Sequence, residues 1–217
     1  MKKLFLSTLL LALPLLASAY DIAVENSDGV TIYYNYYNNG TELEVTRESS
    51  SSYDRYSGAV NIPEEVTYMS RTRKVTSIGS HAFYYCSGLT SVTIGNSITS
   101  IGGSAFYNCT GLTSVTIGNS VTSIGDEAFR GCTGLKKVIV KDIAAWCAIS
   151  FSYYESNPLS SAQHLYSDDN TEIKDLVIPN SVTTIGDFAF SSCKGLTSVT
   201  IPNSVTTIGD WAFISCI

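Results

Sequence analysis

The chain has 217 residues and a formal net charge of −6. Hydrophobic residues make up 44% of it and charged residues only 15%, a balance that is typical of a packed core and excludes an intrinsically disordered protein. The acidic balance also excludes nucleic acid as a partner, because phosphate binding depends on an excess of Lys and Arg.

Residues 1–19 are predicted to be a signal peptide. Two lysines precede an apolar run over residues 4–16, and the small-residue sequence ASA ends at residue 19. This run is too short for a membrane-spanning helix. We therefore expect an exported protein, secreted or on the cell surface, with no transmembrane segment once the signal is cleaved before Tyr20.

Residues 20–59 are predicted to form a β-rich cap followed by a joint. Two runs rich in β-branched and aromatic residues flank Asn38-Asn39-Gly40, which is a typical hairpin turn. A stack of repeats exposes strand edges and apolar side chains at its first rung, so we expect the cap to cover that rung. The polar sequence RESSSSYDRYS, residues 47–57, predicts a flexible joint.

Residues 60–217 repeat with a period of 23 residues. Regular copies begin at residues 89, 112, 173 and 196. A copy that begins at residue 60 carries extra residues, and one that begins at 135 leaves the pattern for an insertion at 141–172. One copy cannot bury its own apolar side chains, so we expect roughly six rungs stacked on a shared core.

Each rung predicts one or two short strands followed by a helical turn. In the copy at 112–134, the sequence VTI alternates inward and outward side chains as a strand does, and Gly118-Asn119 ends it. After a second extended stretch comes a column of preferred helix N-caps: Ser80, Gly103, Asp126, Asp187 and Asp210. Gly134 and its equivalents predict the helix stop.

The pattern L-x-x-V-x-I-x-N-S-V followed by IGDxAFxxCxGL resembles the leucine-rich repeat, and its 23-residue form is similar to the BspA-like class found in exported and surface proteins of bacteria. The resemblance covers residues 60–217. It implies an α+β repeat protein, a leucine-rich-repeat-like solenoid with one or two short strands and a short helical turn per rung, preceded by an N-terminal β-rich cap. It also implies binding or adhesion rather than catalysis, but transfers no binding residue and no surface anchor.

The six cysteines allow three interpretations. Five of them share one repeat position directly after a column of phenylalanines, which favours a buried ladder. Disulfides between adjacent rungs are a second interpretation, because rungs about 4.8 Å apart bring the Cα atoms within bridging range. A catalytic nucleophile such as Cys132 is the third, but neither histidine, His81 or His164, recurs with the cysteines to act as a base.

Other chemistry-bearing residues have structural explanations. Asp126 and Glu127 are adjacent, whereas paired catalytic carboxylates face each other across a cleft. The acidic sequence SDDNTE, residues 167–172, lacks the ligand spacing of a calcium loop and predicts a solvated turn. We therefore expect no enzyme, no catalytic residue, no cofactor and no metal site.

The insertion at 141–172 contains several aromatic residues, among them Trp146, Tyr153 and Tyr154. One interpretation is structural: DIAAWCAI forms a helix whose Trp146, Cys147 and Ile149 pack over the core. The other is a binding loop, since interruptions of solenoids are common sites of binding and aromatic residues are enriched in hot spots.

The strand side chains that face away from the core form a polar, nearly uncharged stripe. It is expected to contain Ser91, Thr93, Ser114, Thr116, Lys137, Ile139, Asp175, Val177, Ser198 and Thr200. The function we expect is an exported, non-enzymatic binding or adhesion protein whose partner is a protein or glycan, host extracellular matrix included. The candidate binding residues are Thr93, Thr116, Thr200, Tyr153 and Tyr154.

A structural function is the alternative. The chain stops at Cys216-Ile217, before its last repeat closes. Ile208, Phe213 and Cys216 would then form an uncovered edge. This predicts a spacer module, or a fragment of a longer array with no ligand of its own, and self-association through the last rung.

Overall fold

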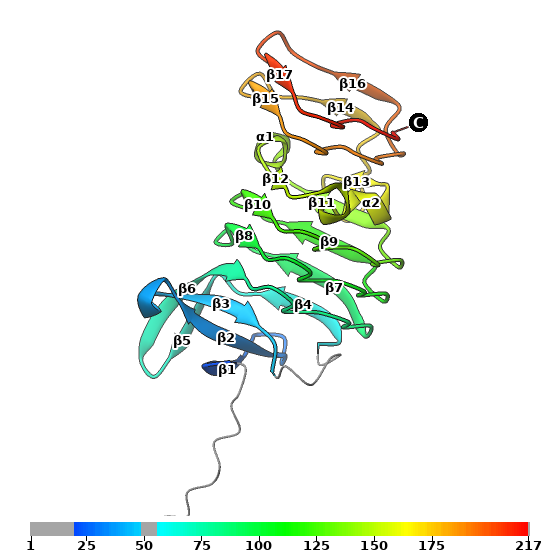
Figure 1. Cartoon of the computed structure of the whole chain (residues 1–217). Coiled ribbons are helices and arrows are strands. Elements are labelled where there is room, and N and C mark those ends of the chain that lie inside the picture. Colours follow the sequence, from blue (N-terminus) through cyan, green and yellow to red (C-terminus); the bar gives the residue numbers. More distant parts are fainter. Residues whose placement is uncertain (1–19, 49–55, 217) are drawn as a thin grey trace, which may run out of the picture.

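The computed structural model of the chain describes residues 20–48 and 56–216. The predicted signal peptide at 1–19, most of the predicted joint (49–55) and Ile217 lie outside the described residues. The rungs stack in chain order from the N-terminal strands to the C-terminal ones, which makes an elongated solenoid (Figure 1).

The N-terminal segment forms three antiparallel strands. They are β1 (Ile22–Glu25), β2 (Thr31–Tyr37) and β3 (Glu42–Thr46), with the short 3-10 turn η1 (Asn38–Gly40) between the last two. The hairpin predicted around Asn38-Asn39-Gly40 is confirmed, since β2 and β3 pair antiparallel. β3 then runs parallel to β6 (Arg71–Ile78), so these strands continue a sheet of the stack. That they act as a cap stays a prediction.

The first strands of successive rungs form a five-stranded parallel sheet. It contains β4 (Gly58–Ile62), β7 (Leu89–Ile94), β9 (Ser114–Ile117), β11 (Lys137–Val140) and β13 (Leu165–Tyr166). The second strands add to the sheet of β1, β2, β3 and β6, with β5 (Glu65–Tyr68) paired to β6 outside this order. They are β8 (Ser100–Ile101), β10 (Ser123–Ile124) and β12 (Ser150–Phe151).

The last two rungs are separate from both sheets. β14 (Asp175–Val177) pairs only with β16 (Ser198–Thr200), and β15 (Thr184–Ile185) pairs only with β17 (Thr207–Ile208), among the strands of the described chain. The insertion that precedes them therefore interrupts strand pairing on both sides of the solenoid (Figure 1).

The 23-residue period sets the register of the stack. Val115 lies opposite Val92 in one neighbouring rung and Val138 in the other. The hydroxyl of Thr122 donates to the Thr99 carbonyl 23 residues earlier, at 3.1 Å. Identical side chains thus come to lie above one another, and their hydrogen bonds link each rung to the one before it.

A ladder of phenylalanines and cysteines fills the core. The rings of Phe83 and Phe106 stack at 4.8 Å with an interplanar angle of 9°, and Phe106 stacks on Phe129 in the same way at 4.9 Å. Cys132 is buried and its thiol donates to the Phe106 carbonyl at 3.0 Å. None of the six cysteines, all of which lie in the described ranges, forms a disulfide, so the buried-ladder interpretation is confirmed and the disulfide interpretation is wrong.

The helical turn predicted in every regular rung is wrong. The residue directly after each predicted N-cap has a left-handed backbone. Its φ lies between 52° and 61° at His81, Ser104, Glu127, Phe188 and Trp211. A left-handed L-residue cannot continue an α-helix. Instead the segment bonds to the next rung: Phe106 N–H donates to Ala128 O and Asn108 N–H to Arg130 O, both at 2.8 Å.

The predicted α+β class is therefore not confirmed, because the described chain consists mainly of strands and turns. The α-helices of the described residues lie in the insertion: α1 (Ile143–Cys147) and α2 (Leu159–Ala162), with the 3-10 turn η2 (Tyr154–Ser156) between them. Across the described ranges, no helix is long and apolar enough to cross a membrane.

Two predicted capping residues have other roles. The carboxylate of Asp187 does not cap a helix of its own rung but accepts from the backbone N–H of Asp210, one rung on, at 2.8 Å. Gly134 does not have the positive φ of a helix-stop glycine. It is required for space, because a Cβ at this position would overlap the Thr110 carbonyl oxygen of the preceding rung.

Replacing Gly134 by Ala should therefore destabilise the solenoid. We expect the free energy of unfolding to fall by about 2 kcal/mol, because the clash is with backbone that cannot move away cheaply. The matched control is Gly103→Ala, where the nearest atom to the new Cβ is the Asp126 carbonyl oxygen at 3.4 Å. Urea unfolding of both variants measures the difference, and equal stabilities would contradict the close-approach explanation.

The cysteines should differ in their reactivity. Burial raises the pKa of Cys147 and of Cys193 to about 12, so neither thiol ionises appreciably at pH 8. Cys216 is only partly buried. Alkylation of the native protein at pH 8, read by mass spectrometry, should label Cys216 first and the other five only after unfolding. Rapid labelling of Cys132 in the native protein would overturn the buried ladder.

Candidate binding site

The insertion packs a short helix over the core. The Asp142 carboxylate caps α1 by accepting from the backbone N–H groups of Ala144 and Ala145, at 2.8 and 3.1 Å. Trp146, Cys147 and Ile149 are buried against the core cluster. The structural interpretation of this part of the insertion is therefore confirmed.

Two side chains of the insertion donate hydrogen bonds to a carbonyl that, in regular rungs, accepts from the backbone N–H of the preceding rung. In regular rungs the Ala128 carbonyl accepts from the N–H of the rung before it. The equivalent carbonyl after the insertion, that of Ala189, accepts from the Trp146 indole at 2.8 Å and from the Asn157 amide at 3.1 Å. The Asn157 amide also donates to the Phe188 carbonyl at 2.8 Å. These side-chain bonds add to two backbone bonds, from Gly186 N–H to the Cys147 carbonyl at 2.9 Å and from Gly195 N–H to the Gln163 carbonyl at 3.1 Å.

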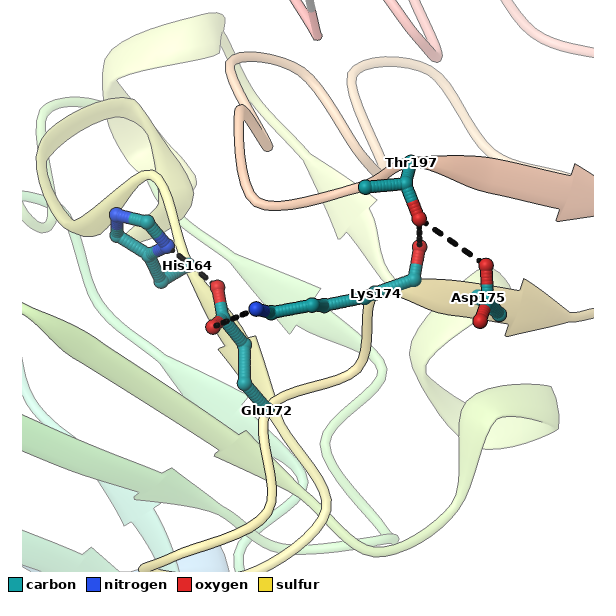
Figure 2. A network of polar contacts seen from close by, with 5 residues as sticks. All are labelled: His164, Glu172, Lys174, Asp175 and Thr197. Atoms are coloured by element: carbon teal, nitrogen blue, oxygen red, sulfur yellow. Dashed lines mark hydrogen bonds and ion pairs between the residues drawn. The ribbon is translucent and has the colours of Figure 1, made fainter.

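A polar network ties the end of the insertion to the last two rungs (Figure 2). Glu172 lies 2.6 Å from His164 Nδ1 and 3.9 Å from Lys174 Nζ. The Thr197 hydroxyl donates to the Lys174 carbonyl and to the Asp175 carboxylate, at 3.2 and 3.0 Å. Hydrogen bonds from Ser198 and Thr197 hold the pKa of Asp175 below its usual range.

This network does not activate a nucleophile. Burial is the main cause that raises the pKa of Cys193 to about 12, and the nearby Glu172 carboxylate raises it further, so the thiol stays protonated at neutral pH. His164 pairs with Glu172 and its other ring nitrogen points away from the remaining residues drawn in Figure 2. Within the described part of the chain, no group of three or more His, Cys, Asp and Glu side chains could hold a metal ion.

The predicted threonine residues are only partly brought together. Thr93 and Thr116 lie opposite each other on β7 and β9 and line a shallow groove of about 350 Å³, the threonine groove, which also contains Glu64 and Lys141. Thr200 lies on β16, opposite Val177 of β14, in a separate sheet.

The stripe that was expected to be polar is interrupted at the insertion. Ile139 is 4% exposed, because Tyr166 of β13 lies beside it in the sheet and Thr116 on its other side. In the next sheet, Val177 is instead 61% exposed. The stripe is therefore polar over the first regular rungs and mixed after the insertion, which the sequence pattern did not predict.

The predicted residues Tyr153 and Tyr154 do meet, in a groove of about 350 Å³ that we call the aromatic groove. Its apolar walls are Tyr153, Tyr154, Phe188, Trp211 and Ile214. The rings of Tyr153 and Phe188 lie 6.0 Å apart. Three serines complete the lining: Ser191, Ser192 and Ser215. Trp211 is 59% exposed and Tyr153 53% exposed.

The left-handed turns of the last two rungs place Phe188 and Trp211 in this groove. Both residues occupy the variable position of IGDxAF, where φ is 59° and 61°. The sequence pattern placed this position in the predicted helical turn, and neither Phe188 nor Trp211 was among the candidate binding residues. The available signal was compositional: earlier rungs have His81, Ser104 and Glu127 there, and only the last two have large aromatic residues.

A second hollow, of about 540 Å³, lies where strand pairing is interrupted between β12 and β15. Small and hydroxyl-bearing side chains line much of it, among them Ala144, Ser150 and Thr184. It contains no exposed large aromatic side chain, so the aromatic groove is the stronger candidate for binding.

A family model described as "BspA type Leucine rich repeat region" matches residues 61–163 and 162–217, in six copies. Among curated proteins, none matches the chain. The match covers the regular rungs and the insertion together.

Several solved structures are similar. A leucine-rich repeat protein from Bacteroides ovatus is 30% identical, with a TM-score of 0.53 over 91% of this chain and 45% of that one. A leucine rich cell surface protein from Faecalibacterium prausnitzii is 24% identical, with a TM-score of 0.47 over 90% of this chain and 52% of that one. The chain thus spans about half the length of these two proteins. The T. pallidum protein TpLRR, 19% identical with a TM-score of 0.53 over 85% of this chain and 86% of its own, shares the fold.

Removing the Asn157 amide should destabilise the end of the solenoid. Asn157→Ala leaves the Phe188 carbonyl without this donor and the Ala189 carbonyl with Trp146 alone, so we expect unfolding to become easier by about 2 kcal/mol. Asn119→Ala, at an exposed turn of a regular rung, is the control. Chemical unfolding measures both, and an unchanged midpoint for Asn157→Ala would contradict the bridging role.

Proposed function

The chain belongs to the BspA-type leucine-rich repeat family, and on that premise we propose that it is an exported, non-enzymatic binding protein with an adhesion role. Solenoids of this type are typically scaffolds for interactions and not enzymes, and the family is typically extracellular or surface-associated. The signal-peptide pattern of residues 1–19 supports export, with the protein secreted or kept at the cell surface.

The aromatic groove is the observation that carries this proposal. Large aromatic side chains are usually buried, so a cluster that lines an open groove is typical of an interaction site. The surrounding rungs are rigid, because the backbone of Phe188 and of Ser192 donates to the next rung at 3.0 and 2.8 Å. Rings held in this way lose little conformational freedom when a ligand binds.

The threonine groove supplies a second contact surface in this proposal. Thr93 and Thr116 present hydroxyl and methyl groups on neighbouring rungs, and Thr200 does so further along the solenoid. Such a surface contributes many small contacts rather than one strong one. The partner is a protein or a glycan, host extracellular matrix included.

A structural role is the second candidate. Val199, Ile201 and Ile208 of the last rung are partly exposed apolar side chains. They favour a spacer module or part of a longer array, with self-association through the last rung in place of ligand binding. Concentration-dependent association, together with no binding to any protein or glycan, would support this candidate over the first.

Binding should depend on the aromatic groove. In pull-down and titration against panels of matrix proteins and glycans, Trp211→Ala and Tyr154→Ala should each weaken binding at least about tenfold, since buried aromatic residues dominate interface energetics. Tyr37→Ala is a matched control, because Tyr37 and Tyr154 are both 40% exposed but Tyr37 lies on the N-terminal hairpin. No binding to either panel, or equal losses in all three variants, would sink this function.

A further inference from the structure

We propose that the aromatic groove is a site for a neutral saccharide, with Ser191 as a specificity-determining contact at its floor. This inference rests on the proposed binding function and names the ligand class of one groove. It follows from three properties of the groove, namely its charge, its surface chemistry and an unpartnered buried hydroxyl.

The charge of the lining excludes an ionic ligand. Tyr, Phe, Trp, Ile and Ser form the whole lining, so none of its side chains is charged. A carboxylate or ammonium group that entered the groove would lose hydration without gaining a partner of opposite charge. Glu155, next to Tyr154 in sequence, lies outside the lining and is paired with Arg130 at 3.6 Å.

The surface chemistry suits a sugar ring. A pyranose has an apolar C–H face and a rim of hydroxyl groups, and it therefore requires both an aromatic face and hydrogen-bonding partners. The exposed rings of Tyr153 and Trp211 supply the first, and the accessible hydroxyls of Ser192 and Ser215 supply the second. An apolar peptide side chain would use the rings and leave the hydroxyls unmatched.

Ser191 provides an independent indication. Its side chain is only 1% exposed, yet it lines the groove, and its Oγ has no hydrogen-bond partner among the described residues. Buried polar atoms without a partner are rare in folded proteins. The Oγ has almost no accessible surface in the free protein, so a ligand hydroxyl supplies the partner that the fold leaves out only as the side chains around Ser191 shift on binding.

The position of Ser191 also explains why the groove exists in this rung. The equivalent residues of the regular rungs before the insertion are large: Tyr84, Tyr107 and Arg130. A serine in this column leaves room between the insertion and the last rung. The space is then bounded by Tyr153 on one side and by Trp211 and Ile214 on the other.

One wall of the groove, formed by Trp211 and Ile214, belongs to the last described rung. Ser104 and Glu127, at the position of Phe188 and Trp211, stay half-buried even though each lies between two neighbouring rungs. A further rung stacked on β16 and β17 would therefore lengthen the groove instead of filling it. This makes a ligand, rather than more of the same fold, the occupant of the groove.

The test is a glycan array with neutral, sialylated and sulfated glycans, followed by titration of the purified chain with the strongest neutral oligosaccharide. Trp211 and the buried Trp146 are the only tryptophans of the chain, so fluorescence reports on the groove directly. We expect saturable binding of neutral glycans, a change in emission that is lost in Trp211→Ala, and protection of Trp211 from acrylamide quenching.

Ser191→Ala separates binding from folding. Because the hydroxyl has no partner in the fold, this variant should keep or slightly raise the melting temperature while weakening neutral-glycan binding about tenfold. Ser150→Ala, at an exposed position of β12 outside the groove, is the control and should change neither.

The outcomes distinguish this inference from the function on which it rests. Binding of charged glycans only, or neutral-glycan binding that survives both Trp211→Ala and Ser191→Ala, overturns the saccharide site. A protein ligand that binds through the groove, with no glycan bound, overturns the saccharide site and leaves the proposed function in place. No ligand on any array overturns both.

Discussion

The hydrogen bond between one rung and the next is the interaction on which the rest of this structure depends. It requires neighbouring rungs to keep the same backbone path, and that requirement fixes which side chains are allowed. Gly134 must lack a side chain because the carbonyl of the previous rung lies where its Cβ would be. The phenylalanine ladder stacks nearly parallel, with an angle of 11° between Phe106 and Phe129, for the same reason. When the strands of neighbouring rungs pair in register, equivalent side chains lie one strand spacing apart.

The insertion shows how the chain keeps the stack together where fewer of these backbone bonds remain, one of them from Gly186 N–H to the Cys147 carbonyl at 2.9 Å. Neither sheet continues from the first rungs into the last two. Trp146 and Asn157 instead carry the donors to the Ala189 carbonyl. The His164, Glu172 and Lys174 contacts secure the other side (Figure 2). Buried carbonyls require donors of some kind, and side chains supply them where a strand cannot.

Function is expected where the stacking requirement is relaxed. The side chains of a regular rung that lie in the core or bond to the neighbouring rung can vary little. The left-handed position of each turn is never fully buried and varies widely, from Glu127 to Phe188 and Trp211. At the interruption, Tyr153 and Tyr154 come to lie beside two such positions. The aromatic groove is therefore a consequence of the repeat and of its interruption together.

The sequence by itself determined the period, the rung boundaries, the buried cysteine column and the short helix around Trp146, because each follows from local pattern and from the repetition of that pattern. It also identified Tyr153 and Tyr154 as candidates. It could not decide whether the IGDxAF segment is a left-handed turn or a helix, because residues such as Asp187 can begin either structure. The two differ in whether the backbone N–H groups bond within the segment or to the neighbouring rung. The partners of those bonds lie one rung away. Only the tertiary structure could therefore place Phe188 and Trp211 beside the insertion, bury Ile139 and leave the Ser191 hydroxyl without a partner.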